Sequence, residues 1–324
     1  MISILSFLLA ANIAAAPVGA YAGPIPMKNH HPLYVGLLSP SPEEAAVVES
    51  YKWTIAANHT NIYLFSSGSE WNVNIDKELT EGDISASVAI IPQRLEAGFN
   101  VPVYHSYEGF MDTTKRWWHG RLGVGTYAGE VDTPDNRYIE TIYHNGNTSL
   151  IGEKGWAAGD ADFWLKAKVW EDKMTVISAQ LLAQAPTGNA DMGYGSGQWE
   201  GVFRMLGEFR HDIMAASMGV GAALPGSLQR GGENIQLDPV YSGFVAFEIP
   251  VVKRLNLVVQ SIGSTSPLKS ADIIEFSREW VEITFGFNYI LESGGVIRLG
   301  FSENLNQTAP DFTMHVSFTG IGGK

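Results

Sequence analysis

From about residue 50 onward, apolar residues alternate with polar or small ones over long stretches. The clearest stretch spans residues 281–291. One face of this stretch carries Val281, Ile283, Phe285, Phe287, Tyr289 and Leu291, and the other carries Glu282, Thr284, Gly286 and Asn288. A period of two predicts a β-strand whose two faces meet different environments.

Thirteen segments show this pattern. They span residues 53–65, 70–78, 83–91, 95–105, 160–170, 174–185, 198–209, 212–224, 237–249, 254–263, 279–291, 295–303 and 311–319. Single-chain bacterial outer-membrane barrels have even strand numbers, so the count is off by one somewhere in the N-terminal half. We predict twelve strands, with fourteen as the alternative, and the pattern leaves the region 106–157 unassigned.

The alternation fits two all-β architectures, a soluble sandwich and a transmembrane barrel. Three features favour an antiparallel transmembrane β-barrel. The segments are long enough for tilted membrane-crossing strands. Their apolar faces are rich in Phe, Trp and Leu. Short and long connections alternate in the C-terminal half, as expected when tight turns lie at one rim and loops at the other.

The N-terminus has the pattern of an export signal. Residues 2–16 form an apolar run that is too short to span a membrane as a helix. Ala20-Tyr21-Ala22 is a small-x-small cleavage site, with Gly23 next. No Lys or Arg precedes the run, which leaves an uncleaved anchor helix as the alternative. We predict a signal peptide over residues 1–22 that is cleaved after Ala22, an N-terminal extension over 23–50 and a barrel over 51–324, located in the bacterial outer membrane.

One short amphipathic helix is predicted between the strands, over residues 110–119. Phe110, Thr114 and Trp117 fall at helical spacing, and Asp112 suits a helix N-terminus. Two placements are open. In the favoured one, Trp117 and Trp118 anchor the helix at the membrane rim. In the other, the helix folds into the lumen as a plug or gate.

Composition narrows the set of partners. Charged residues make up 17% of the chain, below the quarter that is typical of soluble proteins, and the net charge is −13. This acidity argues against a nucleic-acid partner. The chain has no cysteine, and its histidines lack metal-ligand spacing. We expect no cofactor and no metal, with outer-membrane lipid and an unidentified small solute as the partners; the oligomeric state stays open.

Several charged residues fall on the polar strand faces and are therefore predicted to point into the lumen. These candidate pore-lining residues are Lys166, Lys168, Arg204, Glu208, Arg210, Glu248, Glu282 and Arg298, together with His315. Mixed charges inside a barrel either pair into a closed core or line a wet path. At twelve strands the lumen lies between filled and open, so we predict a narrow, partly occluded pore.

His315 and Ser317 form a catalytic-looking spacing. Two residues apart on a strand, they share a face, so an imidazole could activate the hydroxyl. The pair resembles the His-x-Ser of certain outer-membrane lipid hydrolases, in which it faces the bilayer. Here the pair lies on the polar face with Thr313 and Thr319, which is the wrong side for membrane-lipid chemistry. Lining of the lumen is the favoured interpretation.

Several stretches, in order along the chain, resemble a family of bacterial outer-membrane barrels described as a domain of unknown function. They are residues 61–65, 110–119, Gly159-Asp160-Ala161-Asp162, Pro186-Thr187-Gly188, Phe301-Ser302-Glu303-Asn304 and Ala309-Pro310-Asp311-Phe312. A more distant similarity is to the barrel family associated with the phenol-degradation MetA pathway. The chain departs from the pattern where a Gly-Leu-Gly-Asp turn becomes Gly159-Asp160-Ala161-Asp162, and at the C-terminus, where Phe318 is the last aromatic residue. The resemblance implies location and architecture and carries no activity.

Three hypotheses for function follow. The first is a narrow, non-enzymatic channel or transporter for a small or hydrophobic solute. The second is an outer-membrane lipid hydrolase acting through His315 and Ser317. The third is a structural or adhesive barrel whose extracellular loops bind a partner.

Overall fold

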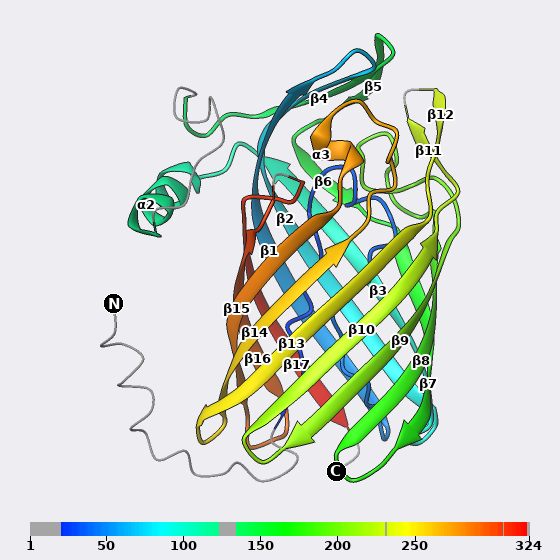
Figure 1. Cartoon of the computed structure of the whole chain (residues 1–324), viewed down its shortest axis with the longest axis vertical. Helices are drawn as coiled ribbons and strands as arrows, with labels where there is room; N and C mark the ends of the chain where they lie inside the picture. The colour runs from blue at the N-terminus through cyan, green and yellow to red at the C-terminus, as the bar shows by residue number, and fades with distance from the viewer. Residues whose placement is uncertain (1–20, 123–133, 231, 307, 323–324) are drawn as a thin grey trace.

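The computed structural model describes residues 21–122, 134–230, 232–306 and 308–322. A closed antiparallel barrel dominates the molecule (Figure 1). Its wall consists of β1 (Tyr51–Ser67), β2 (Trp71–Ile91), β3 (Leu95–Tyr107), β7 (Ala161–Glu171), β8 (Thr175–Ala185), β9 (Glu200–His211), β10 (Met214–Leu224), β13 (Val240–Val252), β14 (Leu255–Ser264), β15 (Trp280–Ile290), β16 (Val296–Asn304) and β17 (Phe312–Gly322). The last strand pairs with the first, from Tyr51↔Gly322 to Asn61↔Phe312. The predicted fold and strand number of twelve are confirmed.

The thirteenth predicted strand comes from splitting β2. The segments 70–78 and 83–91 are two parts of this one strand. Around the point where they meet, Asp76, Lys77, Glu78 and Glu81 are polar at nearly successive positions, and all four are buried. Here β2 crosses the rim, and both of its faces are covered, because Lys77 pairs with Glu140 of a strand above the rim while Glu81 points into the lumen. Polarity therefore no longer alternates, although the strand continues.

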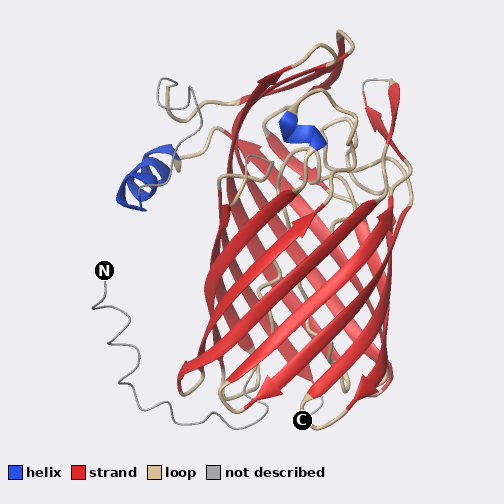
Figure 2. Cartoon of the chain, viewed as in Figure 1, coloured by secondary structure: helices blue, strands red, loops and turns tan. Residues whose placement is uncertain are grey.

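The two rims of the barrel differ, as Figure 2 shows. At one end the strands are joined by short turns, such as those between β9 and β10 and between β13 and β14; we call this the periplasmic end, following other bacterial barrels. The other, extracellular end carries the remaining elements. They are α2 (Asp112–Leu122), β4 (Ile139–His144), β5 (Asn147–Ile151), β6 (Gly155–Ala158), β11 (Ser227–Arg230), β12 (Glu233–Gln236) and α3 (Ile274–Ser277).

The predicted helix over 110–119 is α2, which begins at Asp112. It lies outside the wall at the extracellular end (Figure 1), so the alternative in which it folds into the lumen is wrong. Lys115 ties it to the barrel through Asn61 Oδ1 at 2.6 Å, and Asn61 Nδ2 donates to Asp112. Trp117 is 60% exposed, whereas the side chain of Trp118 lies outside the described residues.

The two faces of the wall separate by polarity. Outward residues are large and apolar, and many are 40% exposed or more; examples are Phe163, Leu165, Phe203, Phe247, Phe287 and Leu299. Inward residues are mostly polar and buried. None of the described helices has the length and apolar character needed to cross a bilayer, a finding that has no bearing on strands. The wall therefore offers hydrocarbon a continuous apolar surface, as transmembrane barrels do.

Residues Tyr21–Ser50, which we call the lumen segment, run inside the barrel before β1 begins (blue trace in Figure 1). The segment starts at the periplasmic end, where the Tyr21 hydroxyl donates to the His211 carbonyl at 2.6 Å. It reaches the extracellular end at His31, which packs against Phe276 of α3. It returns to the periplasmic end at Ser50, whose carbonyl accepts from the Ala89 amide. The lumen is thus crossed twice by the chain's own N-terminal extension.

Candidate functional site

The extracellular end of the lumen contains a large apolar cluster. The top of the lumen segment places Leu33, Tyr34 and Leu37 in one buried cluster with wall and loop residues. Tyr34 lies edge-on to Trp280, with 5.9 Å between ring centroids, and Trp71 lies edge-on to Phe276 at 5.1 Å. Burying aromatic rings supplies much of the packing energy in such a cluster. This layer closes the barrel beneath the extracellular loops.

Below this layer, Glu81 of β2 binds the ascending arm of the lumen segment, which runs from Tyr21 to His31. Lys28 Nζ lies 2.6 Å from Glu81 Oε1, and His30 Nε2 lies 2.6 Å from Oε2. The Tyr104 hydroxyl also donates to Glu81, at 2.9 Å, and accepts from Lys28. A buried carboxylate needs partners of this kind, because an unpaired charge in the interior is costly.

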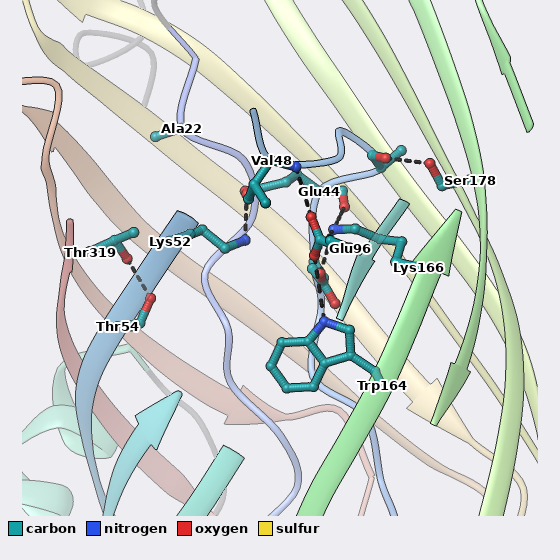
Figure 3. A network of polar contacts seen from close by, with 12 residues as sticks. Ala22, Glu44, Val48, Lys52, Thr54, Glu96, Trp164, Lys166, Ser178 and Thr319 are labelled. Atoms are coloured by element: carbon teal, nitrogen blue, oxygen red, sulfur yellow. Dashed lines mark hydrogen bonds and ion pairs between the residues drawn. The ribbon is translucent and has the colours of Figure 1, made fainter. Parts of the chain in front are cut away.

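The descending arm, which runs from His31 to Ser50, is held by a second network of polar contacts, part of which Figure 3 shows. Glu43 bridges two wall cations: its Oε1 lies 2.6 Å from Lys166 Nζ, and its Oε2 accepts from the Arg204 guanidinium. Lys166 also contacts Glu96 at 3.2 Å, and Glu96 in turn accepts from the Val48 amide at 2.8 Å. The arm is therefore attached to β3, β7 and β9 by charge-assisted hydrogen bonds, which are stronger than neutral ones.

A cavity of about 150 Å³ lies between the two arms and the wall. Its polar lining includes Lys28, Glu43, Glu44, Lys52, Asn58, Glu81, Asp83, Asn100, Asp162, Arg204, Arg298 and Thr319. The arms contribute Pro24, Pro26, Pro40 and Pro42. Proline restricts the backbone to an extended conformation that needs no hydrogen bonds to a neighbouring strand. These arms can therefore stay extended without being part of a sheet. The cavity is large enough for several waters or a small organic group.

At the periplasmic end, Glu248 of β13 receives the start of the lumen segment. Its carboxylate accepts from the Ala22 amide at 3.0 and 3.1 Å and from the Gly23 amide at 2.8 Å. The Ala22 carbonyl accepts from Arg298 Nη2 at 2.6 Å, and the Gly23 carbonyl accepts from Asn288 at 2.8 Å. Both ends of this short stretch are thus bound to the wall.

The nine candidate pore-lining residues all lie on wall strands with side chains turned inward or toward the rim. Lys166, Arg204, Glu208, Glu248, Glu282, Arg298 and His315 are each at most 5% exposed. Lys168 and Arg210 lie near the periplasmic end, where they pair with Glu171 and Glu208. The structure does not bring all nine to one site, because Lys166, Arg204 and Glu248 bind the lumen segment whereas Glu282 contacts Ser302 of the neighbouring strand. Their role as pore-lining residues stays a prediction.

The His315 and Ser317 pair has a hydrogen-bonded third member. His315 Nε2 lies 2.9 Å from Ser317 Oγ, and its Nδ1 lies 2.7 Å from Asn58 Oδ1 on β1. The three side chains are each at most 3% exposed and face the interior. This is the order of a nucleophile, a base and an orienting amide. The cavity reaches Asn58 and Thr319, which flank the pair, and its lining does not include Ser317 itself.

The sequence pattern missed the residues that contact the wall from inside, namely Lys28, His30, Glu43 and the backbone of residues 22–23. They carry no strand periodicity, because they belong to an irregular segment. A signal was nevertheless present, since two Pro-x-Pro pairs, Pro24 with Pro26 and Pro40 with Pro42, lie ahead of the first strand and each is followed within two residues by a charged residue. Such spacing indicates extended chain that needs external hydrogen-bond partners.

One loop contact at the extracellular end is strongly polar. The Asp272 carboxylate, before α3, accepts from the amides of Ser69 and Glu70, which lie between β1 and β2, and of Trp71, the first residue of β2. These amide donors, Glu70 first, lower the pKa of Asp272 to about 2. Within the described ranges, no group of three or more His, Asp or Glu residues is arranged to hold a metal ion.

Comparison with known proteins places this architecture. The profile of the DUF3187 family, described as a protein of unknown function, matches residues 1–320. No curated protein matches the sequence. Among solved structures, the COG4313 outer membrane channel from Pseudomonas putida F1 superposes with a TM-score of 0.56 at 12% identity, covering 88% of this chain and 100% of that one.

Two further structures match more loosely. The NanC porin has a TM-score of 0.47 at 7% identity, covering 84% of this chain and 100% of that one. The P. putida toluene transporter TodX has a TM-score of 0.42 at 11% identity, covering 86% and 91%. The resemblance to an outer-membrane barrel family of unknown function is confirmed, and the fold is that of an outer-membrane channel barrel. The chain belongs to the DUF3187 family.

Proposed function

We propose that this barrel is a channel for small solutes whose passage is controlled by the lumen segment. The observation that carries the proposal is the cavity of about 150 Å³ between that segment and the wall. A barrel that served only as a scaffold would have no reason to keep a charged cavity in its middle. The outer membrane channel from Pseudomonas putida F1 has the same fold, so the architecture is compatible with this class of function.

The layering of the lumen indicates the kind of solute. The extracellular layer around Tyr34, Trp71 and Trp280 is aromatic, and the cavity below it is lined by both acids and bases. A solute must pass the apolar layer and then exchange its water for these polar groups. Such a path suits a compact molecule with an apolar body and one polar group. Because the segment's top residues are almost wholly buried, passage requires part of the lumen segment to shift.

Uptake by proteoliposomes tests the proposal. Benzenesulfonate has an aromatic body, stays charged at neutral pH and therefore crosses lipid slowly, whereas sucrose is larger and wholly polar. We expect the purified protein to admit labelled benzenesulfonate well above protein-free vesicles and to admit sucrose far less. Uptake of both solutes at the protein-free rate would refute a channel of this kind.

The hydrogen-bonded chain of Asn58, His315 and Ser317 favours one second candidate, a hydrolase acting on an ester that reaches the lumen. The burial of all three residues argues against it. Ester hydrolysis by the purified protein that is lost in Ser317→Ala would establish this function. Hydrolysis that is absent, or equal in both proteins, would exclude it.

A further inference from the structure

Two independent features meet at Gly23. In the sequence, Gly23 follows the small-x-small pattern Ala20-Tyr21-Ala22, at which an export signal is cut. In the structure, the nitrogen of the same residue lies 2.8 Å from Glu248 Oε2, inside the barrel at its periplasmic end. Nothing in the cleavage pattern requires the following residue to meet a carboxylate.

Glu248 is built to hold a hydrogen-bond donor. It is 3% exposed, and its Oε1 accepts from Asn256 at 2.7 Å and from Asn288 at 2.9 Å. The two asparagine side chains fix the carboxylate and leave Oε2 to the lumen segment. A second carboxylate borders the same spot, since a β-carbon added to Gly23 would lie 2.8 Å from Glu44 Oε2.

The charge of Glu248 has no direct counter-ion among the side chains that the structure describes. Two other wall carboxylates that bind the lumen segment, Glu81 and Glu96, each form an ion pair with a lysine. Glu248 receives only amide donors, and Glu200 likewise accepts from an amide, that of Leu38. A buried carboxylate without a cation is costly, and the cost falls when a positive group joins it.

From this geometry we infer that signal-peptide removal creates the missing cation, and that the new α-ammonium of Gly23 docks on Glu248 as its ion-pair partner. Water adds across the Ala22–Gly23 bond under an export peptidase. Ala22 leaves with the new carboxylate, and the Gly23 nitrogen takes up protons to become an ammonium. The Gly23 ammonium stays at the position from which the Gly23 amide contacts Glu248 Oε2 in the uncleaved chain.

The consequence is an ion pair that binds the first residue of the processed chain, Gly23, to the wall. Before processing, the position offers Glu248 only neutral amides, whereas after processing it offers a full positive charge. Cleavage also removes the Ala22 carbonyl from Arg298, which keeps Thr319 at 2.7 Å and borders the cavity. The ascending arm is then anchored by its own terminus. The inference holds whether or not the barrel conducts.

The first test is the N-terminal sequence and intact mass of protein purified from outer membranes. We expect a chain that begins at Gly23. A mature chain that begins at any other residue overturns the inference, because the ammonium would then lie away from Glu248.

The second test measures how fast an amine-acylating reagent modifies Gly23 in the folded barrel, with the site read by peptide mass spectrometry. Glu248→Gln keeps the shape and removes the charge, so Gly23 should react about tenfold faster than in the wild type. Glu282→Gln is the matched control, since Glu282 is equally buried on the next wall strand but one and does not contact the lumen segment; its Gly23 should react at the wild-type rate.

Folding of each variant is checked by its shift in gel mobility on heating. If Glu248→Gln does not fold, Glu248→Asp replaces it, because the shorter side chain keeps the charge and withdraws it from Gly23. Faster labelling in either folded variant supports the docked ammonium. Equal labelling of Gly23 in the wild type and in the folded Glu248 variant overturns it.

Discussion

Replacing Glu43 by glutamine is expected to release the descending arm of the lumen segment. Glu43 is the carboxylate that joins this arm to two wall cations, with Lys166 Nζ at 2.6 Å and the Arg204 guanidinium on its other oxygen. The side chains of Lys166 and Arg204 are 0% and 6% exposed, so both charges are buried. Glutamine keeps the size of the side chain and removes its charge.

The free-energy cost of Glu43→Gln depends on the hydrogen-bond and ion-pair partners that Lys166 and Arg204 keep. Lys166 keeps Glu96 at 3.2 Å, and Arg204 keeps the side-chain oxygen of Gln180 on β8. Breaking a buried pair by removing one partner costs about 3–5 kcal/mol, and the retained contacts place this case near the lower end, at about 3 kcal/mol. If that energy opposes release of the arm, the released population rises roughly a hundredfold in Glu43→Gln.

Single-channel recording in planar bilayers measures this change as open probability at fixed voltage. Glu171→Gln is the control, because it removes a carboxylate whose side chain is 49% exposed and which pairs with Lys168 on the same strand. We expect a large rise in open probability for Glu43→Gln and none for Glu171→Gln. A folded Glu43→Gln barrel that opens as rarely as the wild type would refute the reasoning.

Three other outcomes are expected. Phe247→Lys puts a charge in the middle of an outward face and should lower the free energy of unfolding of the barrel in vesicles by about 2–4 kcal/mol. Val252→Lys, at the end of the same strand, should lower it by about 0–1 kcal/mol. Equal losses for the two variants in a denaturant titration would contradict a lipid-facing wall. Ser317→Ala leaves His315 Nε2 without its partner and should lower unfolding stability by about 1–3 kcal/mol; an unchanged melting temperature would mean that the contact contributes nothing. The pKa of Asp272 is depressed to about 2, so its contribution to loop order is present above its unfolded pKa near 4 and is lost as the pH falls through 2. Pepsin should therefore cut the loop over residues 265–279 faster toward pH 2 in the wild type, while Asp272→Asn should be cut at a rate that is high at every pH.

The wall was predictable because the bilayer imposes one rule on every strand. A lipid-facing position must be apolar and its neighbours face the interior, so the alternation in β15 or β17 marks the strand directly. The rule fails where a strand leaves the membrane. In β2, Lys77 and Glu78 are adjacent, polar and both buried, because loop elements cover the face that lipid covers lower down. This is where one strand was read as two.

The lumen could be predicted only in part. The wall side of each contact, such as Lys166, Arg204 and Glu248, was found because it lies on a periodic strand. The partners Glu43, Lys28 and Gly23 lie on irregular chain, where no period links a residue to its environment. One interpretation of the sequence made the helix near Trp117 a plug, because an amphipathic helix is easier to recognise in a sequence than an irregular segment. In the structure, a proline-rich extended segment fills the lumen instead.

The central claim is that the lumen segment controls passage through the barrel, and a reversible crosslink tests it most directly. Ser178 Oγ lies 2.5 Å from the Ala45 carbonyl, so the two residues are neighbours, and the chain has no native cysteine. Any intramolecular disulfide formed in the variant Ala45→Cys with Ser178→Cys therefore joins the segment to β8. With the bond verified by mass, the account predicts that oxidation abolishes conductance and that reduction restores it, whereas Ser178→Cys alone behaves as the wild type. Crosslinked protein that conducts as well after oxidation as after reduction would contradict the claim.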